Sequence, residues 1–404
     1  MLDRLILHVG THKTGTSAIQ YWADNNRSEL LRHNYLYPKT GQWHDHSHHE
    51  LAYHIWGNKN APYSIKPFKS IVSDLEREID NSKCKTVIIS SELLEKVVYE
   101  KAPTENLKHL CEKLCKKLDV VIFLRRQDLL LESVFKQWVK DPSVRFRKMP
   151  TTFKGQYAKF MAYDRLVQSW DELQFVSSVT VVTNALARDP IADFVKSINA
   201  TDLQLLDVES TRTVNQSMDG RALKLRFFLN GLCEDPIIDS RLKKILMLPQ
   251  FNDGRLSLFQ SDEIRSRYLS RFNQSNTKLC EKYNLEPFSS HPVESSGIFK
   301  PLDGCEFYEC LRDIAEIDEK ITWRILNASH CSISSENLSI SQLNKKDQIR
   351  YLTKALSKEE IKNKDLSIKK LKEARQTLNQ KSRRVLQSLE ESGVTIVPRN
   401  QNTK

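Results

Sequence analysis

Short runs of Val, Ile and Leu alternate with longer amphipathic stretches through the first 200 residues, and this rhythm constrains the fold more than any other feature. The runs lack strict polar–apolar alternation, which is typical of strands covered on both faces in a parallel sheet. The expected strands are Arg4–Val9, Thr86–Ser90, Val120–Leu124 and Val179–Val182. The expected helices are Ser17–Arg32, Phe68–Asn81, Glu105–Lys117, Leu129–Lys140 and Ala158–Trp170. The sequence therefore predicts an α/β fold with a parallel sheet flanked by helices, and ligands at the carboxyl ends of its strands.

Helical patterns replace the strand runs after about residue 200, notably at Gly220–Gly231 and Asp262–Tyr283. Residues 285–342 carry no regular pattern and contain Pro287, Pro292 and Pro301, which favours a linker or a small subdomain. We divide the chain accordingly. The ranges are an α/β core at 1–200, a mostly helical part at 201–295 that completes the core, a linker or small subdomain at 296–342, and a basic helical tail at 343–404.

Positive charge is concentrated at the carboxyl end. The chain carries 62 lysines and arginines against 51 acidic residues, and residues 341–404 hold 16 of the former and 7 of the latter. Leu371, Leu378 and Val385 recur every seven residues there, which indicates one long charged helix, with too few clean heptads to predict an oligomeric state. We favour a solvated helix, with peripheral contact to anionic lipid or an acidic polymer as the alternative. Nucleic-acid binding is disfavoured because aromatic residues do not interleave with the charge.

Simple patterns exclude several classes of protein. No run approaches the roughly 18 consecutive apolar residues of a membrane span. The apolar stretch that follows Arg4 is too short for the core of a secretory signal, so we expect a cytoplasmic protein. The eight cysteines form no Cys-x-x-Cys pair, which excludes a zinc ribbon and a thioredoxin-type motif.

The loop after the first strand is the most informative segment for function. It reads Gly10-Thr11-His12-Lys13-Thr14-Gly15-Thr16-Ser17 and opens a helix, whose free N–H groups can bind an anion. The two glycines have the spacing of a phosphate-binding P-loop, G-x-x-x-x-G-K-[ST], but Thr16 stands where that motif has lysine. Lys13 instead precedes the second glycine. This displacement disfavours a Mg²⁺-dependent kinase or NTP hydrolase and suits a shorter anionic group.

A second candidate anion site follows the strand Val120–Leu124. Arg125 comes directly after that strand, Asp128 is expected to cap the next helix, and Ser133 lies on this helix eight residues after Arg125. A guanidinium and a hydroxyl placed in this way can hold a second phosphate group.

Taken together, the two motifs resemble those of the sulfotransferases that use 3′-phosphoadenosine 5′-phosphosulfate (PAPS). The Lys-Thr-Gly-Thr-Ser segment at 13–17 resembles their 5′-phosphosulfate loop, and Arg125 with Ser133 resembles their 3′-phosphate motif. The bacterial carbohydrate-type members often read His-x-Gly-x-x-Lys-Thr-Gly-Thr and Arg-Arg-Gln-Asp, and both patterns stand here at His8–Thr16 and Arg125–Asp128. The resemblance covers about residues 4–285, and one departure is His12, where proline is more usual.

The resemblance implies a P-loop-like fold and PAPS as co-substrate, used without a metal. Lys13 would stabilise the bridging oxygen of the departing phosphate, Arg125 and Ser133 would hold the 3′-phosphate, and Arg212 would add a nucleotide contact. The residues expected around the 5′-phosphate are Thr11, His12, Lys13, Thr14, Gly15, Thr16 and Ser17. The acceptor would be a carbohydrate hydroxyl of a surface polysaccharide or glycolipid, and the range 201–295 would complete its site.

Two segments offer a base for the acceptor hydroxyl. Glu92 follows the strand Thr86–Ser90 at the same sheet edge as both anion motifs, and in the resembling family a Glu or His at this strand end is the usual base. The segment His44-Asp45-His46-Ser47-His48-His49 offers a histidine, and we take His49 as a catalytic candidate beside Lys13 and Glu92. Its spacing matches no standard zinc motif, so no metal site is predicted. A helix-capping or salt-bridging Glu92 and a solvated polar loop at the histidines are the structural alternatives.

Two other functions stay open at this point. A P-loop-like small-molecule kinase would use Glu92 as a metal-binding carboxylate, although the lysine after the second glycine is missing. A non-catalytic scaffold would keep the nucleotide fold and act through the basic tail at 343–404.

Overall fold

The structure is a computed structural model. It describes residues 1–11, 14–43, 45–57, 67–148, 161–184, 189–200, 202–203, 218–231, 236–288, 294–322 and 324–325. His12, Lys13, His44, Arg212 and the tail at 343–404 lie outside the described residues, so the predictions for them stay predictions.

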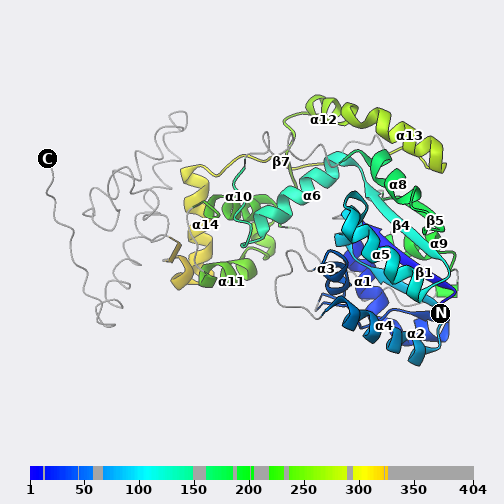
Figure 1. Cartoon of the computed structure of the whole chain (residues 1–404). Coiled ribbons are helices and arrows are strands. Elements are labelled where there is room, and N and C mark those ends of the chain that lie inside the picture. Colours follow the sequence, from blue (N-terminus) through cyan, green and yellow to red (C-terminus); the bar gives the residue numbers. More distant parts are fainter. Residues whose placement is uncertain are drawn as a thin grey trace, which may run out of the picture. The chain divides into compact units, whose positions relative to one another are not determined.

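Five parallel strands form one sheet in the order β2-β3-β1-β4-β5 (Figure 1). The strands are β1 (Arg4–Gly10), β2 (Tyr35–Leu36), β3 (Thr86–Ser90), β4 (Leu118–Arg125) and β5 (Ser178–Asn184). The predicted α/β class and the four predicted strands are confirmed, and the two-residue edge strand β2 is additional. Leu5, Ile6 and Leu7 of the central strand β1 are all at most 1% exposed, as the unbroken apolar pattern predicts for a strand covered on both faces.

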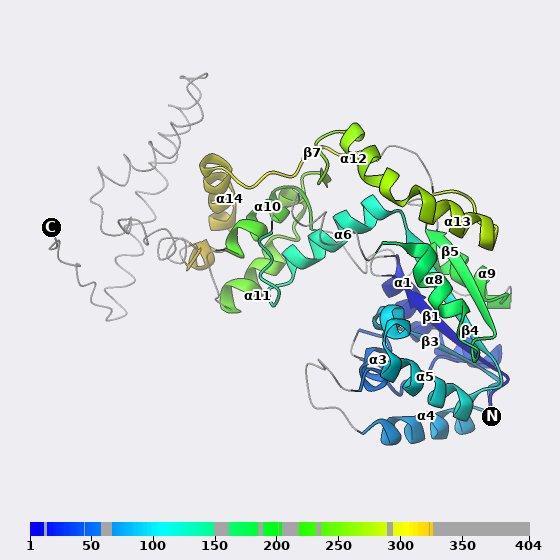
Figure 2. The same ribbon diagram turned by 45° about the horizontal axis from the view of Figure 1, so that its top comes forward.

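Helices connect these strands or follow the last of them in the chain. In the part of the chain that belongs with the sheet, they are α1 (Thr16–Asn25), α2 (Arg27–Arg32), α3 (His49–Ile55), α4 (Phe68–Ser82), the 3-10 helix η1 (Glu92–Tyr99), α5 (Lys101–Leu114), α6 (Gln127–Lys140), α8 (Tyr163–Asp171), α9 (Pro190–Ser197), α12 (Asp262–Leu269), the 3-10 turn η6 (Ser270–Phe272) and α13 (Asn273–Tyr283). Figure 2 shows α8 alongside β4 and β5 and next to α13, and α8 is in contact with each of these three elements.

The core on one face of the sheet is built by α1, α2 and α9 packing on β1, β3 and β4. Its buried side chains are Ile6, Ile19, Trp22, Ala23, Leu30, Tyr37, Ile88, Val121, Phe123, Ile191, Phe194, Val195, Ile198, Ala200 and Leu203. Burial of this much apolar surface holds α1 against β1, since each buried large aliphatic or aromatic side chain contributes about 1.5–3 kcal/mol. The loop between β1 and α1 therefore connects two elements that are both packed in this core.

The chain divides into two compact units. The first comprises Met1–Gln137, Lys148–Ser217 and Leu256–Ile298, and it includes a small second sheet that pairs β6 (Leu256–Ser257) with β7 (Gly297–Ile298). The second comprises Trp138–Arg147, Met218–Arg255 and Phe299–Lys404, the last only as far as the described residues go. These units are defined by contacts and cut across the four ranges drawn from composition, which stay predictions.

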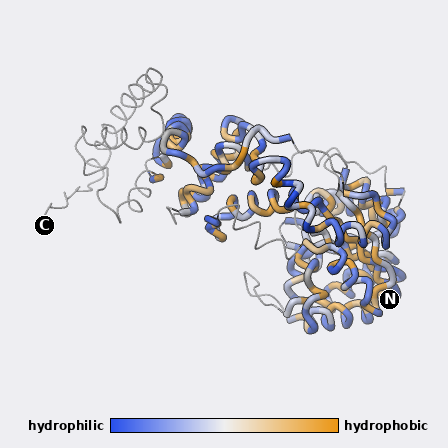
Figure 3. Tube along the Cα trace, turned by 90° about the horizontal axis from the view of Figure 1, so that it is seen from above, coloured by the Kyte–Doolittle hydropathy of each residue, from blue (hydrophilic) through white to orange (hydrophobic). Residues whose placement is uncertain are grey.

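The second unit is helical in its described residues. It contains α10 (Gly220–Leu229), α11 (Pro236–Ile245), the 3-10 turn η5 (Pro249–Phe251) and α14 (Gly304–Ile317). Two ion pairs join α10 to α14, from Arg221 Nη1 to Asp313 at 2.7 Å and from Lys224 Nζ to Glu306 at 2.5 Å. Figure 3 shows hydrophobic and hydrophilic residues alternating along the helices of both units, as amphipathic packing requires.

Several expectations about the helices differ from the structure. Asn26 separates α1 from α2 within the single helix expected at Ser17–Arg32, and the turn η6 separates α12 from α13 within Asp262–Tyr283. The range expected to be irregular contains α14, whose capping box joins Asp303 and Glu306. That box is a readable start signal, so the helix could have been found from the sequence. Across the described helices, none is long and apolar enough to cross a membrane.

Candidate functional site

The loops after β1, β3 and β4 meet at one edge of the sheet, because parallel strands place their carboxyl ends together. The chain builds β2 and β3 on one side of β1 and then crosses to build β4 and β5 on the other. In open α/β sheets, ligands bind outside the carboxyl ends at such a reversal. Residues 11–17 follow β1, Glu92 follows β3 and Arg125 is the last residue of β4, so the topology brings the predicted motifs to the same edge.

Residues 11–17 are here called the anion loop. The described part of this segment contains a left-handed turn at Gly15, directly before α1 begins. Gly15 precedes α1 with φ at 92°, a conformation that glycine adopts without steric cost. Thr16 and Ser17 form the first turn of α1, where backbone N–H groups have no acceptor within the helix. This geometry supplies the oriented N–H donors of an anion site.

The hydroxyls of the anion loop divide into two groups. Thr11 Oγ1 donates to the carbonyl of Phe123 at 2.9 Å, and Thr14 Oγ1 donates to the carbonyl of Thr11 at 2.7 Å. The Thr11 hydroxyl ties the loop to β4 and the Thr14 hydroxyl closes a contact within the loop, so these two side chains position the loop. Thr16 Oγ1 lies 3.5 Å from Thr14 Oγ1, and Ser17 is half-buried on α1. The sequence does not distinguish these four residues. The tertiary contacts separate Thr11 and Thr14, whose hydroxyls hold the loop in place, from the potential ligands Thr16 and Ser17.

Gly10 is required by close approach. A β-carbon placed there would lie 2.5 Å from Thr16 Oγ1, 3.1 Å from Thr14 Oγ1 and 3.5 Å from His8 Nε2. The first of these distances is far below van der Waals contact. The hydroxyls of Thr14 and Thr16 therefore lie closer to the backbone of Gly10 than they could if residue 10 carried a β-carbon.

A buried polar network connects the floor of the anion loop to Glu92. His8 is fully buried, and its Nδ1 lies 2.8 Å from Ser90 Oγ. Gln20 on α1 uses both amide hydrogens, because its Nε2 lies 3.2 Å from Ser90 Oγ and 3.2 Å from Glu92 Oε2. Burial lowers the pKa of His8 to about 3, so its ring is neutral. Gln20 thereby orients the Glu92 carboxylate from the same helix that begins at the anion loop.

Glu92 and His49 lie side by side. His49 Nε2 is 4.0 Å from Glu92 Oε1 and 3.7 Å from Asp45 Oδ2, while its Nδ1 is 2.8 Å from Ser91 Oγ. The side chains of His49 and Glu92 are 13% and 18% exposed, which leaves both reachable by a ligand. The two base candidates of the sequence thus form one pair. Glu92 accepts from the Gln20 amide in the first turn of η1, and His49 is the first residue of α3.

His48 has a structural role. Its Nδ1 accepts the backbone N–H of Ser90 at 3.1 Å, so the ring must carry its proton on Nε2, which lies 3.0 Å from the carbonyl of Pro38. Burial lowers the pKa of His48 to about 4, in agreement with a neutral ring in this tautomer. The ring therefore ties the 38–48 segment to the end of β3 and presents the next residue, His49, to Glu92.

Aromatic rings border this pair. The Trp43 ring centroid is 5.9 Å from that of His49 and 5.4 Å from that of Tyr53, both edge to face. All three side chains are partly exposed. No motif in the sequence marks Trp43 or Gln20, because Trp43 belongs to a loop without a motif and Gln20 is an ordinary helix residue one turn beyond the anion loop.

The second motif is organised by buried ion pairs. Asp128 was expected to cap α6, and this is wrong, because the helix begins at Gln127 and Asp128 lies within its first turn. Its carboxylate instead accepts from Arg126 Nε at 2.7 Å and Nη2 at 2.9 Å. Burial alone would raise the pKa of Asp128, but the guanidiniums of Arg126 and Arg265 hold this pKa below its ordinary value. Arg126 is 7% exposed, whereas Arg125 and Ser133 are half-buried.

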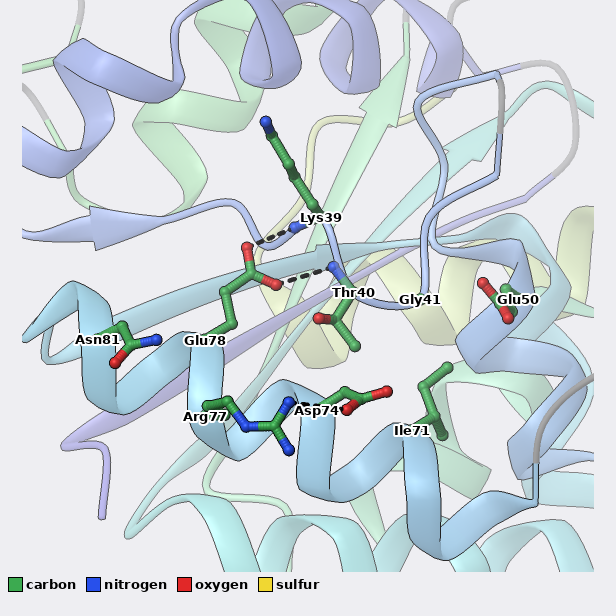
Figure 4. A pocket seen from close by; sticks show the side chains of 9 residues that line it. All are labelled: Lys39, Thr40, Gly41, Glu50, Ile71, Asp74, Arg77, Glu78 and Asn81. Carbon is green, nitrogen blue, oxygen red and sulfur yellow. Dashed lines mark hydrogen bonds and ion pairs between the residues drawn. The ribbon is translucent and has the colours of Figure 1, made fainter.

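A separate cavity of about 420 Å³ lies beside this edge, after β2 (Figure 4). Its lining residues are Lys39, Thr40, Gly41, Glu50, Ile71, Asp74, Arg77, Glu78 and Asn81. The Glu78 carboxylate accepts the backbone N–H groups of Lys39 and Thr40 at 2.7 and 2.8 Å. Of the predicted site residues that the structure describes, none lines this cavity. Through these two hydrogen bonds, Glu78 anchors the segment that carries His48 and His49 to α4.

Comparisons with protein-family models, with curated proteins and with solved structures return no match for this chain. Within the described part of the chain, no three side chains of His, Cys, Asp or Glu converge as metal ligands would.

Proposed function

We propose that this protein is a sulfotransferase that moves a sulfuryl group from PAPS to a hydroxyl of a carbohydrate, in a surface polysaccharide or glycolipid. The observation that carries the proposal is the Glu92–His49 pair at the sheet edge where the anion loop also ends, joined to α1 through Gln20. A P-loop-like core is part of the proposal, because β1, the anion loop and α1 follow one another as a phosphate-binding motif does.

The donor would be bound at both of its phosphate ends. The first-turn N–H groups of α1, with the Thr16 and Ser17 side chains, would hold the 5′-phosphosulfate. Arg125 and Ser133 would hold the 3′-phosphate. Lys13 would stabilise the charge that develops on the bridging oxygen. The proposal includes no metal, because this leaving group carries less charge than a triphosphate.

The transfer needs one base. The acceptor oxygen forms a bond to sulfur while the bond from sulfur to the bridging oxygen breaks, and that oxygen keeps the electron pair as part of 3′-phosphoadenosine 5′-phosphate. The proton of the acceptor hydroxyl passes to the Glu92 carboxylate, and the neighbouring His49 ring stabilises the carboxylate before transfer. Gln20 fixes the carboxylate in place, so the base is oriented before the acceptor binds.

A carbohydrate acceptor fits the surroundings of the base. The partly exposed Trp43 ring beside His49 offers an apolar surface for the face of a sugar ring, and polar groups surround it. Replacing Trp43 with alanine should raise the KM for the acceptor and leave donor affinity unchanged. The proposal further includes a bacterial source, a cytoplasmic location and a basic helical tail at 343–404.

Calorimetric titration tests the proposal directly. The protein is titrated with 3′-phosphoadenosine 5′-phosphate, ADP and ATP, with and without Mg²⁺, beside the variants Lys13→Ala and Arg125→Ala. Arg32→Ala is the matched control, since Arg32 is a surface arginine of the same unit, 73% exposed. We expect metal-independent binding of the 3′-phosphorylated nucleotide, lost in the two test variants only. Mg²⁺-dependent preference for ATP would instead indicate the kinase, and no nucleotide binding at all would indicate the scaffold.

A further inference from the structure

We infer that Arg265, far along the chain in α12, is a positioning residue for 3′-phosphate recognition. The inference rests on the proposed function. It begins from a cluster of four buried charges, Asp128 and Glu132 on α6 with Arg126 and Arg265, all at most 8% exposed. Their charges balance, with two carboxylates against two guanidiniums.

Arg265 binds both carboxylates at once. Its Nη1 lies 2.5 Å from Asp128 Oδ2 and its Nη2 lies 3.0 Å from Glu132 Oε1. The same Nη2 donates to Ser257 Oγ at 2.8 Å, and the guanidinium stacks 4.7 Å from the centre of the Phe259 ring. A planar guanidinium held on this many sides has one orientation. The first two turns of α6 are therefore fixed to a segment more than a hundred residues away in the sequence.

Each proposed 3′-phosphate ligand is the chain neighbour of a residue in this cluster. Arg125 precedes Arg126, and Arg126 donates to Asp128. Ser133 follows Glu132, and Glu132 accepts from Arg265. In each pair the cluster member is buried and the proposed ligand is half-buried. The cluster thus separates the tandem arginines into a structural residue, Arg126, and a residue left at the edge, Arg125.

Stability alone does not explain the cluster. Buried ion pairs are often no more stabilising than apolar residues of the same size, because removing charges from water offsets the attraction between them. Their special property is a fixed geometry, which two ligands for one phosphate group need. The Tyr163 hydroxyl adds a further constraint by donating to the carbonyl of Arg125 at 2.6 Å.

The test compares two nucleotides that differ only in the 3′-phosphate, namely 3′-phosphoadenosine 5′-phosphate and AMP, in the full-length protein. Arg265→Lys keeps the charge but cannot bridge two carboxylates and Ser257. We expect affinity for the 3′-phosphorylated nucleotide to fall about tenfold while affinity for AMP changes little. Ser257→Ala should move the ratio in the same direction to a smaller extent. Arg267→Lys, at an exposed position of the same helix, is the matched control.

The possible results distinguish failure of the proposed function from failure of the positioning role alone. If the unmodified protein does not prefer the 3′-phosphorylated nucleotide over AMP, the proposed function fails and this inference fails with it. If it does, and Arg265→Lys keeps the full preference or loses both nucleotides equally, only the positioning role is overturned. Should Arg265→Lys unfold at the assay temperature, the ratio in Ser257→Ala decides, because that variant leaves all four charges in place.

Discussion

Replacing Gly10 with alanine should weaken nucleotide binding without unfolding the protein. Gly10 is not among the glycines with positive φ, so its backbone accepts alanine and the effect is purely one of space. The added β-carbon would lie 2.5 Å from Thr16 Oγ1, and Thr16 as a residue is only 3% exposed. Thr16 must rotate its hydroxyl away from the anion loop or shift the start of α1.

The magnitude follows from what Thr16 contributes. A hydrogen bond from a hydroxyl to a charged phosphate is worth about 1.5–3 kcal/mol, which is roughly a ten- to hundredfold rise in the dissociation constant when it is lost. Gly297→Ala is the matched control, because the nearest atom to its added β-carbon is Leu256 Cδ2 at 3.6 Å, an ordinary contact. The assay is calorimetric titration with 3′-phosphoadenosine 5′-phosphate, with thermal melts to show that each variant is folded.

A double-mutant cycle identifies the cause. Thr16→Ala removes the hydroxyl that the β-carbon at Gly10 would displace. If that contact is responsible, the double variant binds no more weakly than Thr16→Ala alone, so the two losses are not additive. Undiminished binding by folded Gly10→Ala, or losses that multiply, would refute the reasoning.

Three further predictions concern the base, the buried histidines and the second unit. Glu92→Gln should lower kcat by about 10²- to 10⁴-fold while nucleotide affinity is kept, measured by sulfate transfer and by calorimetry; a loss of affinity alone would contradict its role as base. The folded pKa values of His8 and His48, about 3 and 4, lie below the unfolded value of 6.5, so the unfolded chain takes up protons first and the free energy of unfolding falls as pH drops from about 6.5 towards 4. The loss should reach about 2 kcal/mol per histidine at pH 5, and urea unfolding of His48→Gln should show a shallower pH dependence than the unmodified protein. Asp303→Ala breaks the capping box of α14 and should cost about 1 kcal/mol, seen as faster amide exchange at the start of that helix and nowhere in the sheet.

The sheet was open to prediction from local pattern, with one exception. Unbroken apolar runs such as Thr86–Ser90 identify strands buried on both faces, and the structure places them as parallel neighbours of β1. The edge strand β2 escapes because Tyr35–Leu36 is too short to carry a period. The break at Asn26 escapes for a related reason, since the helical period continues across it.

The sequence by itself determined the α/β class, the glycine-containing loop between β1 and α1 and the positions of Glu92 and Arg125 near the carboxyl ends of their strands, because each follows from residues close together in the chain. Only the tertiary structure decided which hydroxyls brace the anion loop, that His49 meets Glu92, and that Asp128 is bound by two arginines. These contacts join residues far apart in the sequence, and no local pattern records which distant side chain will satisfy a buried charge or hydrogen bond. The geometry of the site therefore depends on the packing of the whole first unit.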